Sequence, residues 1–209
     1  MGIGRRKFLK LFGAVIATAA TNPLQAVIIN DDLYINRTLG LAYKKPLGWH
    51  FLSLESFADI KEKQQLLDSD TTEILKTGDD PIAIISQYPE SSGITFSPSI
   101  TIYVENFELL EGENLQQLVS TLSETYSKAL VDYQFIESPK AILVSDCEAA
   151  EYVSTFIHQQ EGKEALCRHK SIVIVRDSQM YTVNVFDYPE LGRTIDEEYL
   201  EFKDAFKLV

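Results

Sequence analysis

The stretch "FIHQQEGKEALCRH" brings two histidines and a cysteine close together. A two-residue turn at Glu161–Gly162 or at Gly162–Lys163 would fold this stretch into a β-hairpin. His158, Cys167 and His169 would then point to the same face of the sheet, and in the second register His158 lies directly opposite Cys167. Two imidazoles and a thiolate suit zinc or copper, so the hairpin is a candidate metal site.

A competing interpretation makes these three side chains ordinary sheet residues. A three-residue loop would put His158 on the opposite face from Cys167 and His169, and histidines on strands are usually packed or hydrogen-bonded. Cys147 and Cys167 are the two cysteines, and a disulfide between them stays open. No Ser-His-Asp, Cys-His, P-loop or Rossmann pattern is visible, so we expect a protein that is not an enzyme.

The first 26 residues have the three parts of an export signal. A basic region precedes an apolar run, Leu11 to Ala20, which is shorter than the roughly 20 residues of a membrane-spanning helix. Asn22-Pro23 interrupts the helix, and Ala26 offers a small residue for cleavage. The basic region resembles the twin-arginine (Tat) signal, and the residues that match its pattern are Arg5, Arg6, Phe8, Leu9 and Lys10.

Export through the twin-arginine translocase, with residues 1–26 removed, is therefore the expectation. A general secretory signal and an amphipathic helix of the folded domain are the alternatives. The segment holds four of the 19 basic residues and none of the 31 acidic ones, so its removal changes the formal net charge from −12 to −16. Such a surface disfavours nucleic acid and anionic lipid as partners, and no stable membrane insertion is expected after cleavage.

Hydrophobic patterning predicts an α+β chain. Leu54, Phe57, Ile60 and Leu67 lie near helical spacing, which predicts a short helix at 54–67. A longer apolar stripe predicts a helix from Leu115 to Leu130, with Asn114 as its N-cap and Gln117 completing a capping box. Runs of β-branched and aromatic residues predict strands after Tyr43 and at 82–88, 99–107, 133–138, 148–159, 164–177 and 180–188.

The last four of these runs read as an antiparallel meander, with connections at Pro139, Gly162 and Asp177-Ser178. The chain closes with a second predicted capping box, Thr194 to Glu197, followed by apolar residues at helical spacing: Ile195, Tyr199, Phe202 and Phe206. We expect residues 27–40 to be an N-terminal linker or arm. Residues 41–209 are expected to be one domain with a central antiparallel sheet of about six strands flanked by helices.

The spacing of Tyr43, Pro46, Gly48, Trp49 and Phe51, with the helix-then-meander order and a closing helix ending "EFKDAFKLV", resembles the PsbP-like family. That family shares its fold with Mog-type Ran-binding proteins. The resemblance covers roughly residues 41–209 and implies a central antiparallel sheet with helices on both sides. It brings no shared catalytic residues, and it implies an exported protein that acts by docking.

The sequence thus favours an acidic, exported, non-catalytic accessory protein of the bacterial periplasm that binds a protein partner or a small ligand. The lumen of a cyanobacterial thylakoid is the alternative location. No cofactor is expected under this hypothesis. A metal-handling protein using His158, Cys167 and His169 with zinc or copper is the second hypothesis, and an enzyme with a dispersed site is the third.

Overall fold

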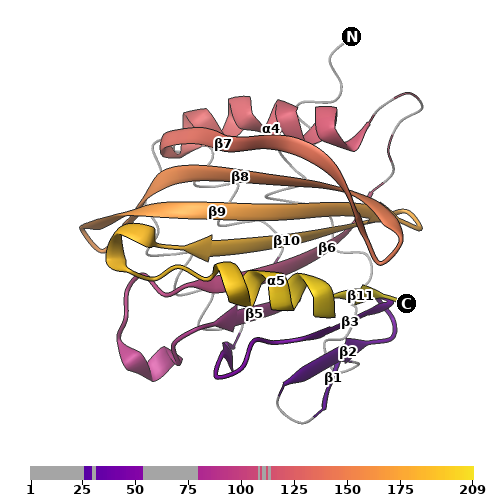
Figure 1. The fold of residues 1–209 in the computed structure, drawn as a ribbon, viewed down its shortest axis with the longest axis horizontal. Helices are drawn as coiled ribbons and strands as arrows, with labels where there is room; N and C mark the ends of the chain where they lie inside the picture. Colours follow the sequence, from indigo (N-terminus) through magenta and orange to yellow (C-terminus); the bar gives the residue numbers. More distant parts are fainter. Residues whose placement is uncertain (1–25, 30–31, 54–79, 108, 110–111, 113) are drawn as a thin grey trace.

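The computed structural model describes residues 26–29, 32–53, 80–107, 109, 112 and 114–209. The described strands form two antiparallel sheets (Figure 1). The larger sheet has seven strands in the order β4-β5-β6-β10-β9-β8-β7, one more than the predicted number. Its members are β4 (His50–Phe51), β5 (Ala83–Ser86), β6 (Ser99–Asn106), β7 (Val131–Val144), β8 (Cys147–Gln160), β9 (Lys163–Arg176) and β10 (Gln179–Asp187).

The smaller sheet comes from the two ends of the described chain, in the order β1-β2-β3-β11. Its strands are β1 (Ala26–Ile29), β2 (Leu33–Asn36), β3 (Leu41–Lys44) and β11 (Lys207–Leu208). The region expected to be a linker or arm, 27–40, therefore contributes two strands. Tyr34 and Leu39 are buried there because they belong to the main hydrophobic core.

The predicted meander is confirmed, because β7, β8, β9 and β10 pair antiparallel in sequence order. Its three turns have positive φ at both central residues, Ser145–Asp146, Glu161–Gly162 and Asp177–Ser178, as two-residue hairpin turns require. The expected connection at Pro139 is wrong, because Pro139 lies inside β7. That strand is at the sheet edge and has register shifts on either side of Glu137, where a proline is tolerated.

Helix α4 (Leu115–Ala129) confirms the predicted long helix, and the Asn114 side chain accepts a hydrogen bond of 2.8 Å from the Gln117 backbone N–H. Helix α5 (Asp196–Ala205) also lies where it was predicted. Its capping box is wrong, because the N-cap is Ile195 and no local side chain caps the helix. A carboxylate from β10 replaces it: Asp187 accepts the Ile195 N–H at 3.2 Å. Short 3-10 turns are η2 (Glu90–Ser92) and η3 (Pro189–Leu191).

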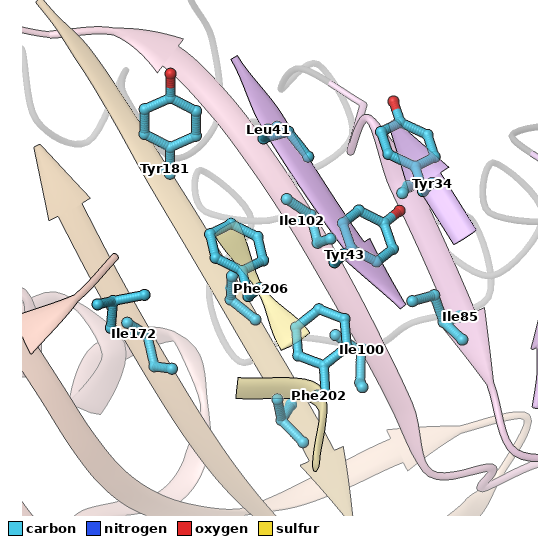
Figure 2. Packing of buried hydrophobic residues seen from close by; sticks show 14 of the residues in the cluster. Tyr34, Leu41, Tyr43, Ile85, Ile100, Ile102, Ile172, Tyr181, Phe202 and Phe206 are labelled. Atoms are coloured by element: carbon cyan, nitrogen blue, oxygen red, sulfur yellow. The ribbon is translucent and has the colours of Figure 1, made fainter. Parts of the chain in front are cut away.

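Side chains alternate between the two faces of the large sheet, so each strand serves both. On the face that we call the α5 face, α5 and the small sheet cover isoleucines and valines of the central strands. Figure 2 shows this core, in which Phe202 of α5 and Phe206, the residue that follows the helix, approach Tyr43 of β3. On the opposite α4 face, Leu115 and Val119 of α4 pack against β8, β9 and β10. The predicted sheet with helices on both faces is therefore confirmed.

The predicted helix at 54–67 lies outside the described residues. The signal residues Arg5, Arg6, Phe8, Leu9 and Lys10 lie outside them too, and Ala26 is the first residue of β1. In the described part of the chain, no helix is both long enough and apolar enough to cross a membrane.

Candidate functional site on the α4 face

The hairpin that carries the two histidines turns at Glu161–Gly162. The pairing of β8 with β9 puts His158 opposite Ala165, while Cys167 is opposite Phe156. His158, Cys167 and His169 therefore share the α4 face, as predicted, but His158 is not directly opposite Cys167. Direct opposition requires a turn at Gly162–Lys163. The turn lies one residue earlier, and this difference separates the two side chains along the sheet.

His169 is held by a complete set of hydrogen bonds inside the protein. Its Nε2–H donates to Asn184 Oδ1 at 3.0 Å, and its Nδ1 accepts from the Ser154 hydroxyl at 3.2 Å. The ring also stacks on Phe186, with centroids 4.9 Å apart. Burial lowers the pKa of His169 to about 4, so the imidazole is neutral at pH 7.

His158 occupies an aromatic environment nearer the end of the same face. Its Nδ1 shares a hydrogen bond of 2.8 Å with the Tyr188 hydroxyl, and its Nε2 is buried without a partner. Phe96 meets the ring edge-on at 5.3 Å between centroids. Burial lowers the pKa of His158 to about 4 as well. Cys167 lies beside Tyr188 and is 0% exposed, and burial raises its thiol pKa far above the usual value, which keeps it unreactive.

The geometry gives the metal hypothesis no support. Both ring nitrogens of His169 are already hydrogen-bonded within the protein. Within the residues that the structure describes, no three His, Cys, Asp or Glu side chains are grouped so that they could hold a metal ion. The site of His158, Cys167 and His169 stays a prediction that metal analysis of the purified protein would test.

The two cysteines are free and lie far apart. Cys167 pairs with Phe156 on β8, nine residues along that strand from Cys147. At about 3.3 Å per residue, this separation is roughly 30 Å of strand, far beyond the reach of a disulfide. The two side chains also point to opposite faces, since Cys147 packs against the α5-face core and Cys167 against Tyr188.

A row of buried polar side chains crosses the centre of the α4 face. Asn184 is paired with Thr101 on β6 and with Ser171 on β9, and Ser171 is paired with Tyr152 on β8. We call these four residues, Thr101, Asn184, Ser171 and Tyr152, the polar row. None is more than 7% exposed. The Ser171 hydroxyl donates to Asn184 Oδ1 at 2.9 Å, which joins the row to His169.

Several hydroxyls of this region make no hydrogen bond of good geometry. They are the buried oxygens of Thr101, Tyr152 and the neighbouring Tyr133. Other hydroxyls lie close to the two phenols, namely Ser171 and Tyr126 beside Tyr152 and Ser154 beside Tyr133. Burial raises the pKa of Tyr152 to about 12 and that of Tyr133 well above its usual value, so both phenols are neutral. These neighbours satisfy the buried hydroxyls only in part, which makes the polar row a less stable packing than an apolar one.

Sequence reasoning found the histidines but missed the polar row. The signal was present, because alternate residues on neighbouring predicted strands are polar where a buried sheet face would be apolar. Tyr152 and Ser154, His169 and Ser171, and Thr182 and Asn184 are those pairs. Recognising the pattern required the register between strands, which the turns alone decide.

The α5 face carries charged contacts instead, and they attach α5 to the sheet. The Glu151 carboxylate of β8 accepts hydrogen bonds of 2.5 Å from the Tyr199 hydroxyl and from Lys203 Nζ. Arg168 pairs with both Asp187 and Asp196, and Lys170 also pairs with Asp196. These groups neutralise one another, and they have a structural role in positioning the helix.

No protein-family model and no curated protein sequence matches the chain. Among solved structures, cyanobacterial PsbP (CyanoP) from Synechocystis sp. PCC 6803 is similar, with a TM-score of 0.54 and 9% identity over 94% of this chain and 100% of that one. LpqN, involved in cell envelope biogenesis of Mycobacterium tuberculosis, has a TM-score of 0.50 and 12% identity over 80% of this chain and 82% of that one. At such identities the similarity concerns the fold, and the fold of this chain is PsbP-like.

Proposed function

We propose that this protein is an exported, periplasmic accessory protein that acts by binding and not by catalysis. The observation that carries the proposal is the chemistry of the α4 face. Its imidazoles, thiol and phenols are all held neutral by burial, with pKa values moved away from those useful for acid–base or nucleophilic work at pH 7. Neutral donors and acceptors of this kind can recognise a molecule, but none of these groups is activated to transform it.

The fold and the N-terminal sequence support the same proposal. LpqN, which has a similar fold, is involved in cell envelope biogenesis, and this chain begins with a segment that resembles a twin-arginine signal. A protein that crosses the membrane already folded would carry its buried polar face intact to the periplasm. The thylakoid lumen is the corresponding compartment if the host is a cyanobacterium.

Cell fractionation in the native host tests the export step. The expected result is a periplasmic protein whose mature N-terminus is Val27, and cytoplasmic retention when Arg5 and Arg6 are both replaced by lysine. The matched control replaces Lys7 by arginine, which keeps the charge and leaves every residue of the matched pattern in place. An unprocessed wild-type protein confined to the cytoplasm would contradict the proposal.

Native mass spectrometry of the periplasmic protein tests the binding step. We expect a bound molecule or partner, and we expect it to be chemically unchanged when it is released from the complex. Conversion of that molecule into a product by the purified protein would overturn the non-catalytic assignment.

A further inference from the structure

Strand β7 forms one edge of the large sheet (Figure 1). Within the residues that the structure describes, it pairs with β8 along one side only, so the backbone groups on its other side can accept a further strand. Natural proteins usually block such an edge with prolines, charged residues or bulges. β7 carries these blocking features along only part of its length.

The first part of β7 is blocked and its last part is open. The register with β8 shifts at several places between Val131 and Lys140. Pro139 lacks an N–H, and Lys140 brings a charged side chain that is 51% exposed. From Lys140 onward the pairing with β8 is regular. The segment Ala141–Val144 contains no proline, charge or bulge, so it is the part of the edge that another strand could reach.

The turn after β7 decides which residues of this segment point outward. Ser145–Asp146 is a two-residue turn, so the residues on either side of it exchange backbone hydrogen bonds. Val144 and, two residues earlier, Ile142 therefore turn their N–H and C=O groups toward β8. Ala141 and Leu143 direct theirs to the outer side of β7, because the direction alternates along a strand.

The side chains of the two outward residues are exposed and apolar. Ala141 pairs with Ala150 of β8, which places Ala141 and Leu143 on the α4 face. Helix α4 does not cover them, since Leu143 is 69% exposed and Ala141 is exposed as well. Ile142 lies on the α5 face and is only partly buried there. An apolar edge with available donors and acceptors favours pairing with another strand.

A second copy of the same segment suits this edge in one antiparallel register. Residues that pair across two strands lie on the same face, and a two-fold axis makes each pair occur twice. Pairing Ala141 with Leu143 of the second copy uses every outward N–H and C=O of both residues. A shift of two residues pairs Leu143 with Pro139, which has no N–H, or Ala141 with Ser145, which has positive φ in the turn.

The same register also matches the side chains. The large Leu143 lies beside the small Ala141 of the other copy on the α4 face. Ile142 lies on the two-fold axis opposite its own counterpart, and pairs of β-branched residues stabilise antiparallel strands. Lys140 lies opposite Val144, so no like charges oppose each other directly.

We propose that the protein forms a weak two-fold dimer in which residues 140–144 of β7 pair antiparallel with the same residues of a second copy. The large sheets of the two copies then join into one continuous sheet. The inference goes beyond the proposed function, because it uses the edge of the sheet and not the polar row. A contact through one short strand is smaller than a standard interface, so we expect a Kd above about 1 μM.

An engineered disulfide tests the register. Ile142 and its counterpart form a non-hydrogen-bonded pair in the dimer, with Cα atoms about 4.5 Å apart, which a disulfide can span. In a Cys147→Ala background, which removes the partly exposed thiol, Ile142→Cys should give a covalent dimer under mild oxidation. The matched control is Lys140→Cys, whose two copies lie about 13 Å apart along the strands. Equal cross-linking of the two variants, or none for Ile142→Cys, would overturn the proposal.

Substitution of the exposed leucine tests whether this edge holds the dimer. Sedimentation velocity on the exported chain, from about 10 μM to about 1 mM, should show a dimer that increases with concentration. Leu143→Lys should weaken dimerisation at least about tenfold, because it places a charge on each side of the paired edge. The matched control is Ile136→Lys, since Ile136 is also exposed but lies in the blocked part of β7. A chain that is monomeric throughout, or equal weakening by both substitutions, would overturn the proposal.

The tests of the proposed function are independent of this dimer. The partner sought by native mass spectrometry is a molecule other than this chain, and the export test needs no partner. An exported chain that binds such a molecule but stays monomeric in the sedimentation experiment would overturn the edge pairing and keep the proposed function.

Discussion

The two faces of the large sheet are built from the same strands, one residue apart, with opposite chemistry. On the α5 face, Ile102, Val183 and Ile172 are directly paired across β6, β10 and β9. One position along, Thr101, Asn184 and Ser171 form the corresponding pairs on the α4 face. The apolar row gains free energy from burial, whereas the polar row must replace its lost water contacts and does so only in part. The difference teaches that one set of strands can present a largely apolar face and a polar one, and the binding function proposed above assigns recognition to the polar face.

Among single substitutions, the largest expected effect comes from removing the Asp187 carboxylate on the α5 face. Its side chain is 2% exposed, pairs with Arg168 and caps α5 through the Ile195 N–H. Asp187→Ala leaves that N–H and part of the guanidinium unpaired, and we expect a loss of about 3 kcal/mol in the free energy of unfolding, measured with urea. The control is Asp196→Ala. Because the Asp196 side chain is 57% exposed, its ion pairs with Arg168 and Lys170 should contribute less than about 1 kcal/mol. Equal losses for the two variants would show that burial does not distinguish these carboxylates.

The pH dependence of stability tests the α4 face, because both of its buried histidines must stay neutral in the folded protein. Their pKa values are about 4 in the folded protein, against about 6.5 for an unfolded histidine. Because the folded pKa is lowered, this stabilisation is complete above pH 6.5 and is lost as the pH falls toward 4, by roughly 3 kcal/mol for each histidine. Glu151 and Asp196 have lowered pKa values and therefore stay ionised through most of this range, so the α5 face should be less affected.

Urea unfolding at several pH values between 7 and 4 measures this effect. The double variant His158→Phe, His169→Gln should show a flatter pH dependence than the wild type, even if it is less stable at pH 7. The control is His50→Gln, because His50 is the third histidine and is exposed. An unchanged slope in the double variant would place the acid-sensitive groups elsewhere.

The helices that cover the two faces differ in how they begin, and the next smaller effect measures this difference. Asn114 caps α4 from within its own segment, so Asn114→Ala should cost about 1 kcal/mol in the urea-derived free energy of unfolding. Thr194 lies at the corresponding predicted position of α5 but makes no cap there. Thr194→Ala should therefore change stability by less than about 0.5 kcal/mol. A loss of stability as large as that of Asn114→Ala would indicate that Thr194 does cap α5.

Each face also carries one cysteine, and their thiols should react differently. Cys147 is partly exposed, whereas Cys167 is fully buried. Titration with a thiol reagent should detect Cys147 in the folded protein and Cys167 only after urea is added. Cys147→Ala should alter stability by no more than about 0.5 kcal/mol. Two thiols that appear only after chemical reduction would indicate a disulfide and contradict the strand register.

Local patterns predicted those parts of the molecule that local interactions determine. The meander, α4 with its Asn114 cap, and the apolar residues of α5 all follow from periodicity and turn residues within short segments. The strand register beside Gly162 depended on which of two adjacent residue pairs forms the turn. A shift of one residue was enough to give His158 a different partner, and no property of the hairpin sequence by itself decides between them.

Long-range pairing determines what the sequence could not predict. Asp187 caps α5 because β10 brings it there, whereas the local sequence offers a plausible cap at Thr194 that the helix does not use. Residues 27–40 looked like a linker because short strands have weak signals, and β3 gains its second partner from β11. The polar row is invisible until four strands are aligned, because each of its members is an ordinary residue in its own segment.

The small sheet has a consequence for the timing of folding during synthesis. β3 pairs with β11, the Val209 N–H donates to the Gly40 carbonyl at 2.8 Å, and Ser145 of the β7–β8 turn receives the Leu208 N–H at 3.1 Å. Strands made near the start of translation must therefore wait for residues made more than 160 positions later. The small sheet cannot be completed until Leu208 has left the ribosome. In a nascent chain stalled before that residue, β3 therefore lacks its partner β11.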